Sequence, residues 1–335
     1  ARHQHRHYGL EVDPDREVVV TTGCTEAIAA ALLGLVDPGD EVVVLEPYYD
    51  SYVAMLEMCG ARRRPVTLRA PDFRPDLDAL RAAITDDTKL VLLNTPHNPT
   101  GTVLTREELQ VVADLAIQHD VIVVTDEVYE HLVFDDARSA EGHVPIATLP
   151  GMWERTLTLS SAGKTFSFTG WKVGWVVAPP ALAEAIANAH QFVTFSTAPN
   201  LQAAVAYGLA KPTDDVERTA AAFAAARDRL ARGLEAQGYA VLPAEGTYFL
   251  SLDLAASGVV AVLNNSASST GHYPNVGPLM LARAGVPPGI HSDPPRDQLP
   301  HPRDELRVPR DGRDAALVRA LQPRLALGAS ASVSL

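Results

Sequence analysis

The sequence predicts an α/β protein with a mainly parallel, doubly wound sheet and a second, smaller domain. From residue 17 to about residue 178, short runs rich in valine, leucine and threonine alternate with longer helical patterns. Such alternation is typical of parallel sheets with helices on both faces. The runs are apolar at nearly every position, as expected for strands that are covered on both sides. At 335 residues the chain is also long enough for two domains.

Individual elements follow from this pattern. The predicted strands are 17–21, 41–46, 89–94, 121–126, 156–160 and 173–178, with helical patterns such as TEAIAAALLGLV and REELQVVADLAIQH between them. Residues 180–209 and 214–237 are predicted to be helical, and strand character resumes at 240–242 and 247–253. We therefore expect a large domain over 1–208 and a small C-terminal domain over 209–335.

The tail and the overall composition limit the possible functions. Ten of the 25 prolines follow residue 254, so only a short helix at 314–322 is expected there. The net charge of −13 argues against a nucleic-acid partner, and the basic run 62–64 is interpreted as a solvated edge. The two cysteines favour a reducing cytoplasm. We expect no signal peptide in ARHQHRHYG, and no apolar run approaches the roughly 18 residues that a membrane span needs.

Three loops at predicted strand ends carry candidate chemistry. Gly23, within TTGCTEA, stands before a helical pattern, where free N–H groups and the helix dipole can bind a phosphate. Asn98, within NTPHNPTG, could donate a hydrogen bond to a ligand oxygen at the carboxyl edge of the sheet. Asp126 and Tyr129 follow an apolar strand, where a buried carboxylate needs a cationic or hydrogen-bonding partner. Each loop also has a purely structural alternative. For the Gly23 loop it is an ordinary capped turn, for the Asn98 loop a rigid turn, and for Asp126 a helix N-cap.

A fourth segment, SSAGKTFSFTGWKVGW, places Lys164 in a turn of small residues between serines and aromatic residues. A lysine that loses its hydration in such a pocket becomes a usable amine nucleophile. Lys172 follows, where a second cation could meet a phosphate.

Together with EPYYDSY and DEVYEHLVFD, these segments resemble the class I/II aminotransferases, which are fold-type I enzymes that use pyridoxal 5′-phosphate (PLP). The likeness covers about residues 2–253 and is greatest to the branch of kynurenine, glutamine, methionine and N-succinyldiaminopimelate aminotransferases. It implies a large domain with a seven-stranded-type sheet between helices, a smaller α/β domain and a homodimer. It also implies a ping-pong transfer of an amino group from an L-amino acid to a 2-oxo acid.

The resemblance also implies roles for individual residues. Lys164 would form the internal aldimine with PLP and later move the substrate proton. Asp126 would pair with the pyridine N–H⁺, and Asn98 and Tyr129 would bond the phenolic oxygen. Tyr49 would stack on the ring. The residues implied to surround the phosphate are Gly23, Cys24, Thr25, Ser161 and Lys172.

The ends of the chain differ from the family pattern. The chain begins within what would be the first large-domain helix, so we expect a preceding substrate-contacting segment to be absent. Beyond residue 253 the likeness nearly ends, but Arg307 stands six residues before Arg313, as an arginine in the family does. Arg307, with Asn98, is therefore the candidate for binding the substrate, since a guanidinium suits a carboxylate. An exposed loop arginine is the alternative.

Two other functions remain open from the sequence: a cysteine-conjugate β-lyase and a catalytically impaired PLP-binding protein. A metal site is not expected. His3 and His7 stand one helical turn apart, but the sequence shows no third ligand, so a solvated helix face is predicted.

Overall fold

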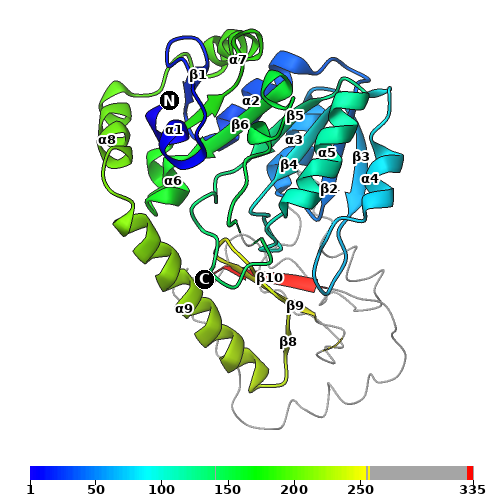
Figure 1. Cartoon of the computed structure of the whole chain (residues 1–335), viewed down its shortest axis with the longest axis vertical. Coiled ribbons are helices and arrows are strands. Elements are labelled where there is room, and N and C mark those ends of the chain that lie inside the picture. The colour runs from blue at the N-terminus through cyan, green and yellow to red at the C-terminus, as the bar shows by residue number, and fades with distance from the viewer. Residues whose placement is uncertain (140, 254–255, 257–329, 335) are drawn as a thin grey trace, which may run out of the picture. The chain divides into compact units, whose positions relative to one another are not determined.

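The computed structural model describes residues 1–139, 141–253, 256 and 330–334. A seven-stranded sheet forms its centre, in the order β1-β7-β6-β5-β4-β2-β3 (Figure 1). The strands are β1 (Val18–Thr21), β2 (Glu41–Glu46), β3 (Arg62–Thr67), β4 (Thr88–Asn94), β5 (Ile122–Asp126), β6 (Thr156–Ser161) and β7 (Gly174–Val177). In this sheet β7 pairs antiparallel with β1 and β6, and the other four pairs are parallel, so the predicted mainly parallel sheet is confirmed.

The predicted strand bounds agree with the observed ones to within one or two residues, but the sequence did not predict β3. Its sequence RRRPVT has one buried residue, Val66, and it pairs with β2 at the edge of the sheet. Arginines and Pro65 are tolerated there because one side of an edge strand needs no ladder partner. The run 62–64 is therefore a solvated edge, as predicted, and it is itself part of a strand.

Helices cover both faces of this sheet. Val42 and Val44 pack in one apolar cluster with α2 (Cys24–Leu35), α3 (Asp50–Met58) and α7 (Pro180–Val193). Val43 and Leu45, which alternate with them along β2, pack in another cluster with α4 (Leu77–Ala83) and α5 (Arg106–Gln118). Because successive side chains of a strand point to opposite faces, both faces must be apolar. The uniform apolar runs in the sequence have this cause.

The remaining helices and strands complete the described chain. A third apolar cluster joins Trp175 and Val177 of β7 to Val205 of α8 (Pro199–Leu209). The other elements are α1 (Arg2–Tyr8), α6 (Ala162–Thr165), α9 (Asp214–Glu235), the 3₁₀ turns Ile146–Thr148, Trp153–Arg155 and Thr169–Trp171, and the strands β8 (Ala240–Val241), β9 (Phe249–Asp253) and β10 (Ser330–Ser334). The stretch 180–209, predicted as helical, is two helices, and 214–237 is the single helix α9, which ends at Glu235.

Contacts divide the chain into two compact units. The first consists mainly of Ala1–Gly233 and Leu242–Ser251, and the second includes Leu234–Val241. Most residues after 253 lie outside the described part, as does the helix predicted at 314–322. The domain boundary after residue 208 therefore stays a prediction. None of the described helices is both long and apolar enough to cross a membrane.

One glycine lets strand β7 approach the loop before α2. A Cβ atom on Gly174 would lie 2.7 Å from the carbonyl carbon of Gly23, 2.8 Å from the nitrogen of Cys24 and 2.9 Å from the oxygen of Ser160. All three are backbone atoms, so no side chain can turn away to make room.

We expect Gly174→Ala to lower the free energy of unfolding by about 1–3 kcal/mol, the usual cost of forcing extra atoms into packed structure. Urea unfolding followed by circular dichroism measures this. Gly233→Ala is the matched control, because its Cβ would meet nothing within 4 Å and alanine favours a helix such as α9 by about 0.5–1 kcal/mol. Equal stability of the Gly174→Ala variant and the wild type would contradict the close approach.

Candidate active site

All ten residues that the sequence assigned to the cofactor line one cavity of about 260 Å³. They come from segments at the carboxyl ends of β1, β2, β4, β5 and β6, the edge at which ligands bind in open α/β sheets. The cavity is lined by Gly23, Cys24, Thr25, Ile28, Tyr49, Asn98, Asp126, Val128, Tyr129, Ser161, Lys164, Thr169, Lys172, Tyr248 and Phe249. The folded chain therefore brings together groups that are up to about 225 residues apart in sequence, from Gly23 to Phe249.

Asp126, the last residue of β5, is a buried carboxylate with neutral donors around it. The Tyr52 hydroxyl donates to its Oδ2 at 2.6 Å, and the Cys24 thiol lies 3.5 Å from its Oδ1. Burial raises the pKa of Asp126, although the hydrogen bond from Tyr52 acts in the opposite direction. Burial also raises the pKa values of Tyr52 and Cys24, so both stay protonated and can donate. A ligand that brings a cationic N–H to this carboxylate would relieve the cost of its burial.

The amine of Lys164 faces two tyrosines. Lys164 lies in α6, which begins after Ser161, whose Oγ accepts a hydrogen bond from Gly163 N. Its Nζ donates to the hydroxyl of Tyr248 and lies 5.4 Å from the centre of the Tyr129 ring. Within the described residues, no carboxylate lies at ion-pair distance from this amine. The lysine is thus held by hydroxyl and aromatic groups that do not neutralise it.

The uncapped start of α2 lies beside Lys172. Gly23 precedes the helix with φ of 78°, and no side chain caps the helix N-terminus. Positive φ favours glycine because a Cβ is strained there. The backbone of Lys172 lies 3.7 Å from the position of a Cβ on Gly23, so the lysine stands beside the helix start. Free N–H groups and a cation together suit a phosphate.

Asn98 and Tyr49 are positioned by neighbouring polar and aromatic groups. Asn98 N donates to Asn94 Oδ1 at 2.6 Å, and Asn94 Nδ2 donates to the carbonyl oxygen of Asp126 at 2.8 Å. The loop after β4 is therefore tied to the end of β5. Tyr49 precedes α3, and its ring meets the edge of Tyr52 at 5.7 Å between centres.

Sequence reasoning did not assign Tyr52, Tyr248 or Phe249 to this site. Tyr52 stands three residues after Tyr49 at the start of a helix, a spacing that could have placed both on one face. Tyr248 carried no such signal, because its contact with Lys164 joins segments 84 residues apart. Arg307 lies outside the described residues.

The prediction of a solvated face for His3 and His7 is wrong for His3. Its side chain is 8% exposed, and its Nε2 lies 2.8 Å from Nε2 of His131. The short helix α1 packs against the protein through this histidine, which the spacing of His3 and His7 alone could not reveal.

Comparisons with known proteins agree with the geometry. The family model "Aminotransferase class I and II" matches residues 1–275. The "Probable N-succinyldiaminopimelate aminotransferase DapC" of Mycobacterium tuberculosis (strain ATCC 25618 / H37Rv) is 49% identical over 258 residues, which are 76% of this chain and 63% of that protein. "Kynurenine--oxoglutarate transaminase" of Dictyostelium discoideum is 41% identical over 74% of this chain and 60% of its own length. The chain thus spans less than two thirds of the length of these relatives.

Solved structures give the same result. The N-succinyldiaminopimelate aminotransferase of Mycobacterium tuberculosis matches with a TM-score of 0.74 at 44% identity, covering 86% of this chain and 71% of that one. YbdL of Escherichia coli, described as having a methionine aminotransferase function, matches with a TM-score of 0.73 at 35% identity, with the same two coverages.

We expect Tyr52→Phe to raise the pKa of Asp126 further, because the carboxylate loses its shortest donor. The pKa of Asp126 in the folded protein lies above its value of about 3.8 in the unfolded chain. The free energy of unfolding therefore falls as the pH rises from about 4 through the folded-state pKa of Asp126. The variant should therefore be less stable than the wild type by about 1–3 kcal/mol at pH 7, with a smaller difference near pH 4. Urea unfolding across this pH range measures it.

Tyr48→Phe is the matched control, because the Tyr48 hydroxyl is bonded to the exposed Arg63 and not to a buried carboxylate. A pH-independent loss of stability in Tyr52→Phe would show that the hydroxyl does not act through Asp126.

Proposed function

This chain belongs to the class I and II aminotransferase family, and we propose that it is a PLP-dependent aminotransferase that moves an amino group from an L-amino acid to a 2-oxo acid. Its fold is that of the fold-type I PLP transferases. The observation that supports the proposal most is that a lysine amine, a buried carboxylate and an uncapped helix N-terminus line the same cavity. The reaction would run in two halves, one for each substrate, as a ping-pong cycle.

The residues present fit the cofactor. Asp126 is a buried carboxylate whose bonded partners are neutral, so it can accept a hydrogen bond from a protonated ring nitrogen. The phosphate would be bound by the backbone of Gly23, Cys24 and Thr25, together with Ser161 and Lys172. Lys164 supplies the amine that would hold the cofactor covalently.

Further residues would orient the cofactor ring. Tyr49 lines the cavity with its aromatic ring and would stack on it. Asn98 and Tyr129 would donate hydrogen bonds to the phenolic oxygen. Burial raises the pKa of Tyr129, so its hydroxyl keeps its proton and remains a donor. We also propose that Asn98 lies within reach of the substrate.

When bound, PLP supplies an electron-withdrawing ring that stabilises negative charge at the substrate α-carbon. Asp126 would hold the proton on the ring nitrogen and so maintain that capacity. Once a substrate has released it, Lys164 Nζ would accept the proton from the α-carbon as a general base. Tyr248, which accepts a hydrogen bond from this Nζ, would keep the amine oriented into the cavity.

The relatives reported above favour transfer over the alternatives. Those proteins are described as transaminases or aminotransferases, and no feature of the described site favours β-elimination. A β-lyase would release pyruvate without a 2-oxo acid acceptor, whereas an aminotransferase requires one. An impaired PLP-binding protein would take up the cofactor without turnover in either assay.

Lys164→Ala should abolish covalent attachment of PLP. We expect the variant to lose the visible absorbance of lysine-bound PLP, to yield no PLP-labelled peptide after borohydride reduction, and to lose at least about 1,000-fold in kcat/KM. Lys89→Ala, an exposed lysine of β4, is the matched control and should keep all three properties. A reducible adduct in Lys164→Ala would place the covalent site at another lysine.

The substrates are best sought with a panel of amino donors and 2-oxoglutarate. N-succinyldiaminopimelate comes first, because the similar protein and solved structure from Mycobacterium tuberculosis are both described as its aminotransferase. Kynurenine and methionine follow, from the other relatives. Turnover of none of these donors by a PLP-loaded protein would contradict the proposed activity.

We further propose a cytoplasmic homodimer. Both cysteines are buried and unpaired, which suits a reducing compartment. Phe192 and Phe195, at the end of α7, are 86% and 78% exposed, and exposed large apolar side chains are typical of interfaces.

We expect the wild type to sediment as a dimer, and Phe192→Asp with Phe195→Asp to weaken dimerisation by at least about tenfold, since buried charges are costly at an interface. Met58→Asp, at another exposed apolar residue, is the control. A monomeric wild type in sedimentation velocity would contradict the proposal.

A further inference from the structure

Two histidines of α1 meet a third histidine from a segment more than 120 residues further along the chain. His3 and His7 lie one turn apart on this helix, and His131 follows β5. The ring centres are 4.6 Å apart for His3 and His7, 5.0 Å for His3 and His131, and 4.9 Å for His7 and His131. One ring nitrogen of each lies within 4.8 Å of the others.

These spacings suit a common metal ion. With zinc–nitrogen bonds of about 2.0–2.1 Å and tetrahedral angles, the centres of two bound imidazole rings lie about 5 Å apart. All three measured separations are close to this value. Ligand nitrogens on such an ion are about 3.3 Å apart, whereas Nε2 of His3 and Nε2 of His131 are 2.8 Å apart. Binding therefore requires these two rings to separate by roughly half an ångström.

A buried carboxylate lies next to the cluster, because Glu130 directly precedes His131 in the chain. Glu130 is 5% exposed, and its bonded partners are the neutral hydroxyls of Tyr8, at 2.5 Å, and Ser160. A buried carboxylate with only neutral partners gains from a cation nearby, and an ion held by the three histidines would supply one.

Each histidine has a ring nitrogen at the cluster, and a metal ion binds imidazole through the lone pair of such a nitrogen. His7 and His131 are only partly buried, which leaves a route from solvent.

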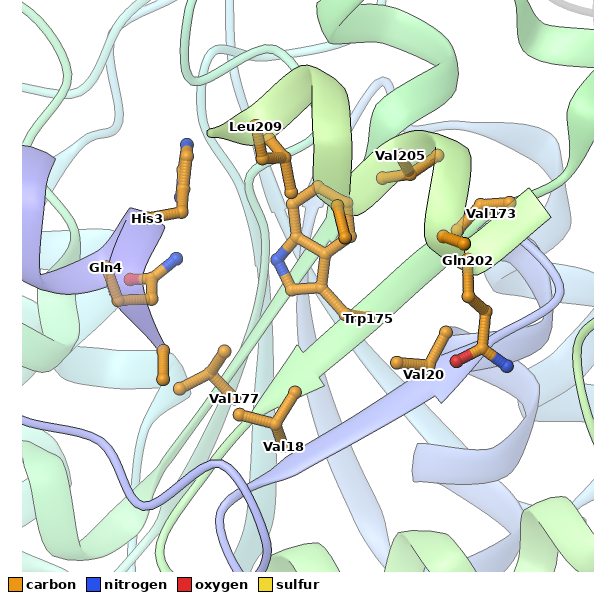
Figure 2. Close-up of a pocket in the computed structure, with 13 residues that line it drawn as sticks. His3, Gln4, Val18, Val20, Val173, Trp175, Val177, Gln202, Val205 and Leu209 are labelled. Atoms are coloured by element: carbon orange, nitrogen blue, oxygen red, sulfur yellow. The ribbon is translucent and has the colours of Figure 1, made fainter. Parts of the chain in front are cut away.

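The other side chains around His3 leave room for water. His3 and Gln4 line a second cavity of about 340 Å³, together with valines of β1 and β7 and Trp175 (Figure 2). His3 Nδ1 and both amide atoms of Gln4 are buried without a hydrogen-bond partner in the described part of the chain. Water in this cavity could accept the proton of Nδ1 when Nε2 binds a metal, as outer partners of metal-bound histidines commonly do.

We propose that His3, His7 and His131 bind a divalent late-transition-metal ion of the Zn²⁺ type, with Glu130 as its buried counter-charge. Three imidazole nitrogens favour zinc, cobalt, nickel or copper over magnesium or calcium, which prefer oxygen. The ion would fasten α1 to the segment after β5. This site is separate from the PLP residues, so the inference does not depend on the proposed transamination.

The test is Zn²⁺ affinity of the whole chain after removal of metal with a chelator, measured by competition with a chromogenic chelator. We expect one ion per chain. His7→Ala and His131→Ala should each weaken binding at least about 100-fold, because each removes a direct ligand. His5→Ala is the matched control: it lies on the same helix, is 63% exposed, and pairs with Glu11. Its affinity should equal that of the wild type.

Two further measurements identify the ligands and the counter-charge. Co²⁺ in place of Zn²⁺ should give a visible absorption spectrum typical of nitrogen ligands in the wild type and His5→Ala, but not in His7→Ala. Glu130→Gln, which removes the charge and keeps the shape, should weaken Zn²⁺ binding by about 10- to 100-fold.

Circular dichroism without metal checks that each variant folds. If His131→Ala does not fold, His7→Ala decides the question alone, because His7 is only partly buried. Equal Zn²⁺ affinity in the wild type and His7→Ala would overturn the proposal. So would a wild type that binds no Zn²⁺, which would mean that His3 and His131 share a proton instead of a metal.

Discussion

The hydrogen bond from Tyr52 to Asp126 is the interaction on which the cavity depends. Asp126 ends a central strand and is almost fully buried, so its charge requires donors that cannot move away. Those donors come from α2 and α3, which pack on the same face of the sheet. The positions of both helices against β5 therefore decide the electrostatic character of the cavity. The same helices have Gly23 and Tyr49 at their starts, so the residues proposed to contact the cofactor ring and phosphate are positioned by the same packing.

Each buried carboxylate in the segment at and after the end of β5 has different neighbours. Asp126 faces the cavity, Glu127 pairs with His143 at 2.7 Å, and Glu130 is bonded to Tyr8 and Ser160. Three buried carboxylates within five residues would destabilise the fold if any one lacked a partner. Because each has its own, the segment is fixed at several points, and Tyr129 between them has little freedom to leave the cavity.

The sequence predicts those parts of the fold that depend on continuous apolar runs. Strands covered on both faces are rich in apolar and β-branched residues, so six of the seven were found to within one or two residues. The edge strand β3 was not predicted, because three arginines and a proline give it no apolar run. The residues expected to bind the cofactor were chosen through motif resemblance, and all of them line one cavity.

Contacts between distant segments could not be predicted in this way. Tyr248, which directly precedes β9, reaches Lys164, although its sequence position indicates only that a strand begins there. His131 joins His3 across 128 residues, and no spacing rule connects them. Such pairs are set by the order and direction of strands in the sheet, which local sequence patterns do not specify.

The close approach at Gly174 has a consequence for binding entropy. Backbone atoms of β7, β6 and the loop before α2 touch there with no side chain between them. Side chains are the parts of a protein that change rotamer most easily, so a binding surface built from packed backbone has few conformations to lose. An anion held at the start of α2 would therefore cost the protein little conformational freedom, and its affinity would come from a surface already ordered before the anion arrives.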